Sequence, residues 1–321
     1  MNDVADFDVA IIGAGPSGSV SAALLHQQGF RVCVIERTHF PRFVIGESLL
    51  PYSMDILEEA DLVRVVQAQQ GFQYKNGAAF TWGERYTWFD FTDKFSKGPG
   101  TTFQVQRAVF DKILIDEVER RGVTVRYGQN VTGYEEVEGA SGEHLARLRI
   151  EAPEGAYTLQ ARFVLDASGY GRVLPRLLGL ERPSVLSPRK AIFTHIDDCI
   201  VGDDFDRNKI LISTHPAERG VWSWLIPFGN GRSSIGFIGE PEWINQRAAG
   251  LKAADEGALN EALLRGVVAE IPRLSRILRN AVWDNGVPFS SISNYSANVT
   301  TLVGRNFALL GNAAEFLDPV F

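Results

Sequence analysis

The sequence predicts a mixed α/β fold whose first part is a parallel sheet flanked by helices. Residues 7–12 form an almost continuous apolar run, as in a strand that is buried on both faces of a parallel sheet. A glycine-rich turn follows at residues 13–18, then an amphipathic segment that ends at Gly29, then a second apolar run at residues 31–35. Strand, glycine turn, helix and strand is the order of a Rossmann-type nucleotide-binding unit.

The glycine turn and the acid after the second strand predict what this unit binds. Gly13 permits the tight turn, Gly15 lets the backbone approach a pyrophosphate, and Gly18 lets the helix lie close to the strand. The helix start around Ser17 offers unpaired N–H groups and the positive end of the helix dipole to phosphates. Glu36 stands where an acidic side chain accepts a hydrogen bond from a ribose hydroxyl. These positions predict an adenine dinucleotide and leave FAD and NAD as alternatives.

Hydrophobic periodicity places the remaining elements. Residues 106–121 carry apolar side chains at helical spacing and end before Gly122, which makes this segment the clearest helix. Ser48 is expected to cap a helix around Met54. Further helices are expected at 62–66, 242–246 and 255–271, and strands at 123–127, in an antiparallel meander over 131–165, in the strand-rich region 190–239, and at 303–310 before a glycine turn at 311–314.

Composition excludes several classes of function. The chain has 321 residues, enough for two parts around a large core, and its formal charge of −7 argues against a nucleic-acid partner. No apolar run approaches the length of a membrane span, and the N-terminus has no secretory leader pattern. Cys33 and Cys199 are expected as reduced thiols buried in strands, which favours a cytoplasmic protein. The five histidines lack the spacing of metal ligands, so no metal site is expected.

Three short stretches resemble the FAD-contacting motifs of the aromatic-hydroxylase-like flavoproteins. They are residues 13–18 with Glu36, Asp-Ala-Ser-Gly at 166–169, and Gly-Asn-Ala-Ala at 311–314. The helix that begins with Gln106 and Arg107 resembles the helix of that group whose arginine lies near the flavin. The resemblance implies a Rossmann-like FAD-binding domain of the aromatic-hydroxylase type joined to an antiparallel-sheet substrate domain.

The same resemblance implies a set of cofactor contacts. Asp166 is expected to support its turn and has no catalytic role, and Asn312 stands where hydroxylases usually have aspartate. An asparagine can still hydrogen-bond the ribityl chain. The implied FAD contacts are Gly13, Gly15, Ser17, Gly18, Glu36, Arg37, Gly46, Glu47, Ser48, Arg107, Asp166, Gly311, Asn312 and Ala313.

Three further stretches resemble the flavin-dependent halogenases, in their tryptophan-halogenase-like branch. They are residues 40–51, Lys75 within residues 72–77, and the hexapeptide 222–227, which is the most specific part of the match. The resemblance implies that reduced FAD, supplied by a separate flavin reductase, reacts with O2 and chloride or bromide to give hypohalous acid. The acid would travel through a tunnel to Lys75, which presents an electrophilic halogen to an electron-rich aromatic ring.

The chemistry of lysine agrees with that role for Lys75. An ammonium group can donate a hydrogen bond to hypohalous acid, and a neutral amine can itself be halogenated. Burial among aromatic side chains would lower the pKa of the amine and make the neutral form accessible. The neighbours expected to bury it are Phe72, Tyr74, Phe80 and Trp82. The alternative is an ordinary solvated lysine on a loop.

The hexapeptide is expected to separate the flavin from the substrate. Trp222 and Trp224 are two residues apart, so on a strand both point to one face. By resemblance, they line a partition along the tunnel together with Ile226 and Pro227. The alternative is that both tryptophans are ordinary core residues, and the two interpretations are compatible.

The resemblance also implies the domain organisation. Residues 1–85, 101–185 and 296–321 are expected to form a discontinuous FAD-binding domain, and residues 86–100 and 186–295 a substrate-facing sheet domain. In the family the halide lies against backbone N–H groups just after the Asp-Pro motif, here Asp318-Pro319. A further C-terminal region is therefore expected after residue 321.

Three functions remain open from the sequence. The first is a halogenase of a phenol, pyrrole or indole that is free or tethered to a carrier protein, with no nucleic-acid or membrane partner. The second is an FAD-dependent aromatic monooxygenase, or an isoprenoid-type reductase, that uses NAD(P)H to reduce its own flavin. The third is a non-enzymatic flavoprotein that serves as a binding module.

Overall fold

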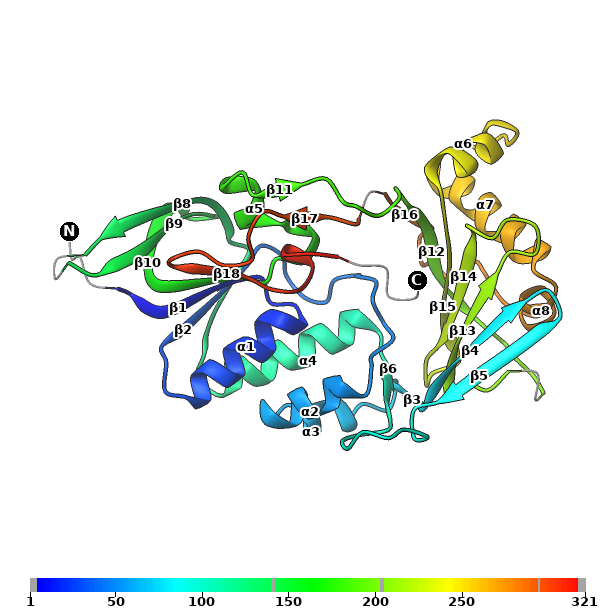
Figure 1. Cartoon of the computed structure of the whole chain (residues 1–321), viewed down its shortest axis with the longest axis horizontal. Helices are drawn as coiled ribbons and strands as arrows, with labels where there is room; N and C mark the ends of the chain where they lie inside the picture. The colour runs from blue at the N-terminus through cyan, green and yellow to red at the C-terminus, as the bar shows by residue number, and fades with distance from the viewer. Residues whose placement is uncertain (1–4, 140–141, 203–204, 294, 317–321) are drawn as a thin grey trace.

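The computed structural model describes residues 5–139, 142–202, 205–293 and 295–316. It contains two seven-stranded sheets, which lie at opposite ends of the molecule (Figure 1). The first sheet contains, in spatial order, β7 (Thr124–Tyr127), β2 (Val32–Glu36), β1 (Phe7–Ile12), β10 (Gly155–Asp166), β9 (His144–Ala152) and β8 (Asn130–Glu138), and β18 (Phe307–Leu309) also pairs with β10. Its β7, β2, β1, β10 and β18 run parallel, whereas β10, β9 and β8 form an antiparallel meander. The nucleotide-binding unit and the meander predicted from the sequence are both present.

Helices cover one face of the first sheet. They are α1 (Pro16–Gln27), α2 (Tyr52–Glu59), α3 (Val63–Gln67) and α4 (Arg107–Arg120). Val9 and Ile11 of β1 face these helices, whereas Ala10 and Ile12 pack with the meander and with α5 (Val173–Leu177) on the other face. A strand buried on both faces explains the continuous apolar run.

The second sheet is mainly antiparallel. Its spatial order is β16 (Ser290–Ser293), β12 (Lys190–Asp197), β15 (Arg232–Gly239), β14 (Trp222–Pro227), β13 (Lys209–Thr214), β4 (Gly77–Trp82) and β5 (Arg85–Asp90), with β13 and β4 parallel. One face packs on α6 (Pro241–Ala249), α7 (Glu256–Glu270) and α8 (Pro272–Ile277). The other face packs on Ile45, Tyr170 and Phe316. Every residue of β14 is buried because both faces are covered.

Short pairs of strands lie between the sheets and beside them. β3 (Gln73–Lys75) pairs with β6 (Thr102–Gln104), and β11 (Glu181–Arg182) pairs with β17 (Asn298–Val299). The single-turn helices η1 (Gly169–Gly171) and η2 (Gly311–Ala313) follow β10 and β18. The segment expected as a strand at 303–310 is therefore strand only at its end.

Several expectations from the sequence differ from the structure. Ser48 does not cap a helix, because α2 begins at Tyr52 after Pro51, and Ser48 instead forms a β-bridge with Gln104. Cys33 is buried, but Cys199 follows the end of β12 and is exposed, at a positive φ of 45°. The expected domain boundary after residue 85 falls at the first residue of β5, which forms a hairpin with β4 in the second sheet. The full domain boundaries stay a prediction.

Over the described residues, no helix is long and apolar enough to cross a membrane.

Candidate active site

The three predicted nucleotide-contacting turns meet at the carboxyl ends of the parallel strands. A Cβ on Gly13 would lie 2.6 Å from the carbonyl oxygen of Ala167, and a Cβ on Gly311 would lie 3.0 Å from the hydroxyl of Ser17. Within the first turn, a Cβ on Gly18 would lie 2.0 Å from the carbonyl oxygen of Gly13. Glycine is required at Gly13 and Gly18, where a Cβ would clash with backbone atoms, and Gly311 has a positive φ of 52° that favours glycine.

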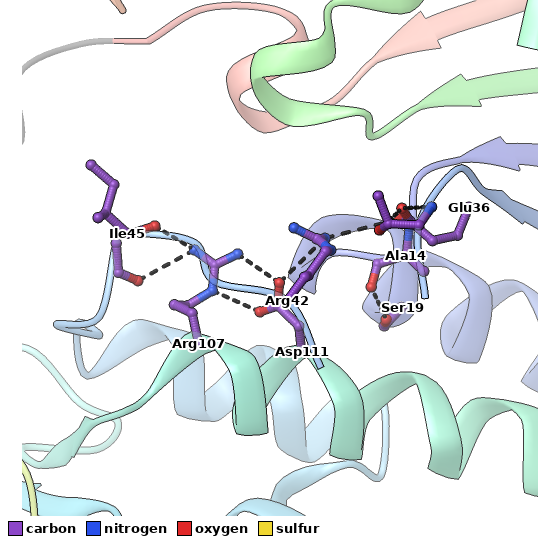
Figure 2. Close-up of polar contacts among 9 residues, drawn as sticks. Ala14, Ser19, Glu36, Arg42, Ile45, Arg107 and Asp111 are labelled. Atoms are coloured by element: carbon purple, nitrogen blue, oxygen red, sulfur yellow. Dashed lines mark hydrogen bonds and ion pairs between the residues drawn. The ribbon is translucent and has the colours of Figure 1, made fainter. Parts of the chain in front are cut away.

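Glu36 fixes the shape of the glycine turn. Its carboxylate is buried and accepts hydrogen bonds from the backbone N–H of Ala14 at 2.9 Å and from the N–H and hydroxyl of Thr38 at 3.0 and 2.6 Å. Figure 2 shows the contact with Ala14. The acid therefore holds the loop from the end of β2.

A buried aspartate connects this turn to the loop of residues 43–50. Asp111 of α4 is fully buried and binds the guanidinium of Arg107 at 2.6 and 3.0 Å, and Arg42 lies 3.4 Å away (Figure 2). Arg107 also donates to the carbonyl oxygens of Ile45 and Gly46 at 3.0 and 3.4 Å. The side chain expected to contact the flavin thus holds the backbone of the neighbouring loop.

The residues around this junction fit an adenine dinucleotide. A cavity there is lined by Ile12, Gly13, Ile35, Glu36, Arg37, Thr38, Arg42, Gln129, Asn130, Val131, Ala167, Ser168, Gly171 and Val173. Gly15 is the N-cap of α1 and has no side chain to occupy the first N–H groups of the helix. Arg42 Nε and Ser48 Oγ are buried without a hydrogen-bond partner among the described residues. Arg42 and Ser48 belong to the loop after β2, so the donors that a pyrophosphate would meet at the helix start are the backbone N–H groups of the first turn of α1.

The other predicted cofactor residues support the turns. Asp166 is buried and accepts from the backbone N–H groups of Ser168 and Leu174 at 2.9 and 2.6 Å, and burial raises the pKa of its carboxyl above the usual range. Arg172 donates to the carbonyl oxygens of Asn312 and Ala314 at 3.5 and 3.3 Å. Ala313 is buried in η2, and the contact expected of the Asn312 side chain stays a prediction.

Lys75 is buried between the two sheets, with only 2 % of its surface exposed. Its Nζ donates to the carbonyl oxygen of Leu49 at 2.7 Å and lies 5.1 Å from the centre of the Phe91 ring. Burial lowers the pKa of the ammonium from 10.5 to about 7. The neighbours differ from those expected, since Tyr74 and Trp82 are exposed. Tyr74 precedes Lys75 on the same strand, so its side chain points to the opposite face.

The tryptophan pair lies on the face of the second sheet that packs on Ile45, Tyr170 and Phe316, opposite the face covered by α6, α7 and α8. Trp222 and Trp224 are buried with ring centres 6.2 Å apart, and Trp224 Nε1 donates to the hydroxyl of Ser234 at 3.0 Å. They share a cluster with Ile226 and with Ile45 of the loop 43–50. Pro227 is buried at the end of the same strand.

A buried pair that the sequence analysis missed joins the two parts. Glu47 of the loop 43–50 hydrogen-bonds to Nε2 of His195 on β12, and the exposed fractions of the two residues are 2 % and 9 %. The rings of Phe43 and Phe228 lie 5.0 and 5.1 Å from the imidazole. These partners are 148 residues apart in the chain, so no local pattern relates them.

Comparison with known proteins identifies the family. A family model described as "FAD binding domain" matches residues 6–268. The chain belongs to the FAD-binding domain family. The family model supports FAD over NAD as the dinucleotide, and the individual cofactor contacts stay a prediction.

Curated and solved relatives of this FAD-binding chain include halogenases. It is 28 % identical to tryptophan 2-halogenase of Chondromyces crocatus, over 97 % of this chain and 57 % of that protein. It is 27 % identical to the 1H-pyrrole-2-carbonyl-(peptidyl-carrier protein) chlorinase of Pseudomonas fluorescens, over 98 % of this chain and 72 % of that protein. The structure of the myxobacterial chondrochloren halogenase CndH, described as an FAD-dependent halogenase, is 30 % identical over 98 % of this chain and 70 % of that one, with a TM-score of 0.82. The resemblance to flavin-dependent halogenases is confirmed.

One solved relative carries a different name. The flavoprotein/dehydrogenase of Cytophaga hutchinsonii is 40 % identical over 98 % of this chain and 73 % of that one, with a TM-score of 0.86.

The chain spans 57 % of the tryptophan 2-halogenase it matches. Asp318 and Pro319, expected beside the halide, lie outside the described residues. Among the residues that are described, no three His, Cys, Asp or Glu side chains gather as metal ligands.

Proposed function

We propose that this protein is a flavin-dependent halogenase that transfers an electrophilic halogen from Lys75 to an electron-rich aromatic substrate. The observation that carries the proposal is the burial of Lys75 between the two sheets, with its amine on the carbonyl oxygen of Leu49. A lysine is seldom buried without an opposite charge unless its amine has a task. The halogenase relatives favour the same activity.

The glycine turns and the loop 43–50 would bind the FAD. Reduced FAD, when bound, would supply two electrons and the halide two more, so that one oxygen atom of O2 leaves as water and the other is carried by hypohalous acid. The first turn of α1 would bind the pyrophosphate, and Arg107 keeps the backbone at Ile45 and Gly46 in place.

Lys75 has the protonation behaviour that a halogen relay requires. With the pKa of its amine near 7, both the ammonium and the neutral amine are populated at neutral pH. The ammonium can donate a hydrogen bond that polarises hypohalous acid, and the neutral amine can accept the halogen and release water. Trp222 and Trp224 would form the partition between this amine and the flavin side.

The proposed partners follow from the same chemistry. A separate flavin reductase would supply the reduced FAD, and chloride or bromide would be the second substrate. The aromatic substrate is a phenol, pyrrole or indole. The chlorinase relative is named for a pyrrole on a peptidyl-carrier protein, which supports testing a carrier-bound substrate as well as free ones.

Turnover with a flavin reductase, NADH, FAD, halide and a panel of phenols and pyrroles tests the proposal. Products are read by mass spectrometry for the halogen isotope pattern. Lys75→Ala is expected to lower halogenation by roughly a hundredfold or more while flavin oxidation continues. Lys209→Ala is the matched control, because Lys209 is also buried, with an exposed fraction of 6 %, but binds Asp206 and Asn76 at 2.8 and 3.0 Å. Normal halogenation by the Lys75 variant would exclude the relay.

A second candidate is a flavoprotein that reduces its own FAD with NAD(P)H. The observation that favours it is the name of the Cytophaga hutchinsonii relative. Mixing the FAD-loaded protein with NADPH or NADH in the absence of oxygen separates the two functions. Rapid bleaching of the flavin without a reductase supports the second candidate, and no bleaching supports the halogenase.

A further inference from the structure

A hydrogen bond between two distant segments ties the loop 43–50 to the second sheet. Glu47 comes from the loop and His195 from β12, and both are buried. The imidazole is itself held, because the rings of Phe43 and Phe228 pack on it. A buried carboxylate without a partner is strongly unfavourable, so Glu47 is constrained to stay where His195 can donate to it.

A short path of hydrogen bonds leads from Glu47 to Lys75. The carbonyl oxygen of Glu47 accepts from the N–H of Val105 at 2.8 Å, and the N–H of Leu49 donates to the carbonyl oxygen of Phe103 at 3.2 Å. Residues 47–49 therefore run beside β6, which pairs on its other side with the strand that carries Lys75. The carbonyl oxygen of Leu49 then accepts from Lys75 Nζ.

We propose that His195 is a positioning residue for Lys75, which it controls by holding Glu47 and with it the Leu49 carbonyl that accepts the lysine amine. The proposal rests on the proposed function for its meaning, because Lys75 matters as the relay. It assigns no contact between His195 and substrate or flavin. Removing the His195 imidazole frees residues 47–49 from the second sheet, and water then reaches the Lys75 amine.

The test is the pH dependence with which Lys75 reacts with acetic anhydride, measured by peptide mass spectrometry on the purified protein. The exposed Lys97 serves as the internal standard. In the wild type, the midpoint for Lys75 is expected near pH 7. In His195→Leu we expect the midpoint to rise by about one pH unit or more, toward the 10.5 of a solvated lysine. His195→Gln should stay near the wild type, because its amide N–H can still donate to Glu47.

Three more variants complete the test. Glu47→Ala breaks the same hydrogen bond from the loop side and leaves β12 intact, so it replaces His195→Leu if that variant does not fold. The double variant should shift the midpoint no further than either single variant, because both act on one interaction. His215→Leu is the matched control. His215 is also a buried histidine, and it hydrogen-bonds at 2.8 Å to Glu270, the last residue of α7.

Unchanged midpoints in folded His195→Leu and Glu47→Ala would overturn the inference and leave Lys75 as a candidate relay. An equal shift in His215→Leu would also overturn it, because the effect would then be a general loosening of the sheet. Acylation requires neither halide nor reductase. A shifted midpoint in a protein that does not halogenate would therefore support the positioning role while excluding the proposed function.

Discussion

Replacing Lys75 with methionine is expected to stabilise the folded protein at neutral pH. Burial lowers the pKa of the Lys75 amine from 10.5 to about 7, whereas the amine of the unfolded chain titrates near its ordinary value. Each unit of difference corresponds to about 1.4 kcal/mol, so the buried amine destabilises the folded state by about 5 kcal/mol at neutral pH. Methionine has a similar length and no charge to desolvate.

One contribution opposes this gain. The variant loses the hydrogen bond from Nζ to the Leu49 carbonyl, which contributes about 1 kcal/mol and leaves a buried acceptor unpaired. The expected net increase in the free energy of unfolding is therefore about 2–4 kcal/mol at pH 7. Between pH 7 and 10.5 the unfolded state binds the proton that the folded state lacks, so wild-type stability rises with pH in this window. The advantage of the variant must shrink accordingly.

Urea unfolding of both proteins near pH 7 and near pH 10, followed by tryptophan fluorescence, measures this difference. Lys209→Met is the control and should lose stability, because its amine is paired with Asp206 and Asn76. A Lys75→Met variant that is less stable than wild type at pH 7, or whose advantage is the same at both pH values, would refute the reasoning. Either result would mean that the Lys75 amine is solvated.

Two more substitutions test the cofactor side. Gly18→Ala brings a Cβ to 2.0 Å from the carbonyl oxygen of Gly13, and we expect weaker FAD retention on gel filtration and a loss of about 1–3 kcal/mol in urea unfolding. Retention of FAD with wild-type affinity would contradict the close packing of the turn. Asp111→Ala leaves the guanidinium of Arg107 without its buried carboxylate, and a loss of about 3–5 kcal/mol is expected in the same assay. A loss below about 1 kcal/mol would show that water replaces the carboxylate.

The nucleotide-binding unit could be predicted from the sequence because its signals are local. The apolar run, the glycine turn and Glu36 lie within 30 consecutive positions and each has a direct physical meaning. Placing Asp166 and Gly311 beside the same turn required the family resemblance, because strand order is not written in the local pattern. The structure shows the pairing that brings them together, with β10 between β1 and β18.

The surroundings of Lys75 could not be predicted in the same way. Aromatic residues near it in the chain were expected to bury it, but alternation along the strand sends Tyr74 to solvent. The residues that contact its amine, Leu49 and Phe91, come from other segments of the chain. His195 was missed for the same reason, since its partner Glu47 is distant in the chain. Cys199 was misplaced because the strand ends two residues before it and the chain turns outward.

The two oxygens of Glu36 bear on which nucleotides this fold can accept. One accepts from the N–H of Ala14 and the other from the N–H and hydroxyl of Thr38, so both oxygens of the carboxylate are held against the loop. A nucleotide with a phosphate on the 2′ oxygen of its adenosine would bring a second anion to the same spot, and the repulsion would exclude it. We therefore expect the loop to accept cofactors with an unmodified sugar and to bind a 2′-phosphorylated one more weakly.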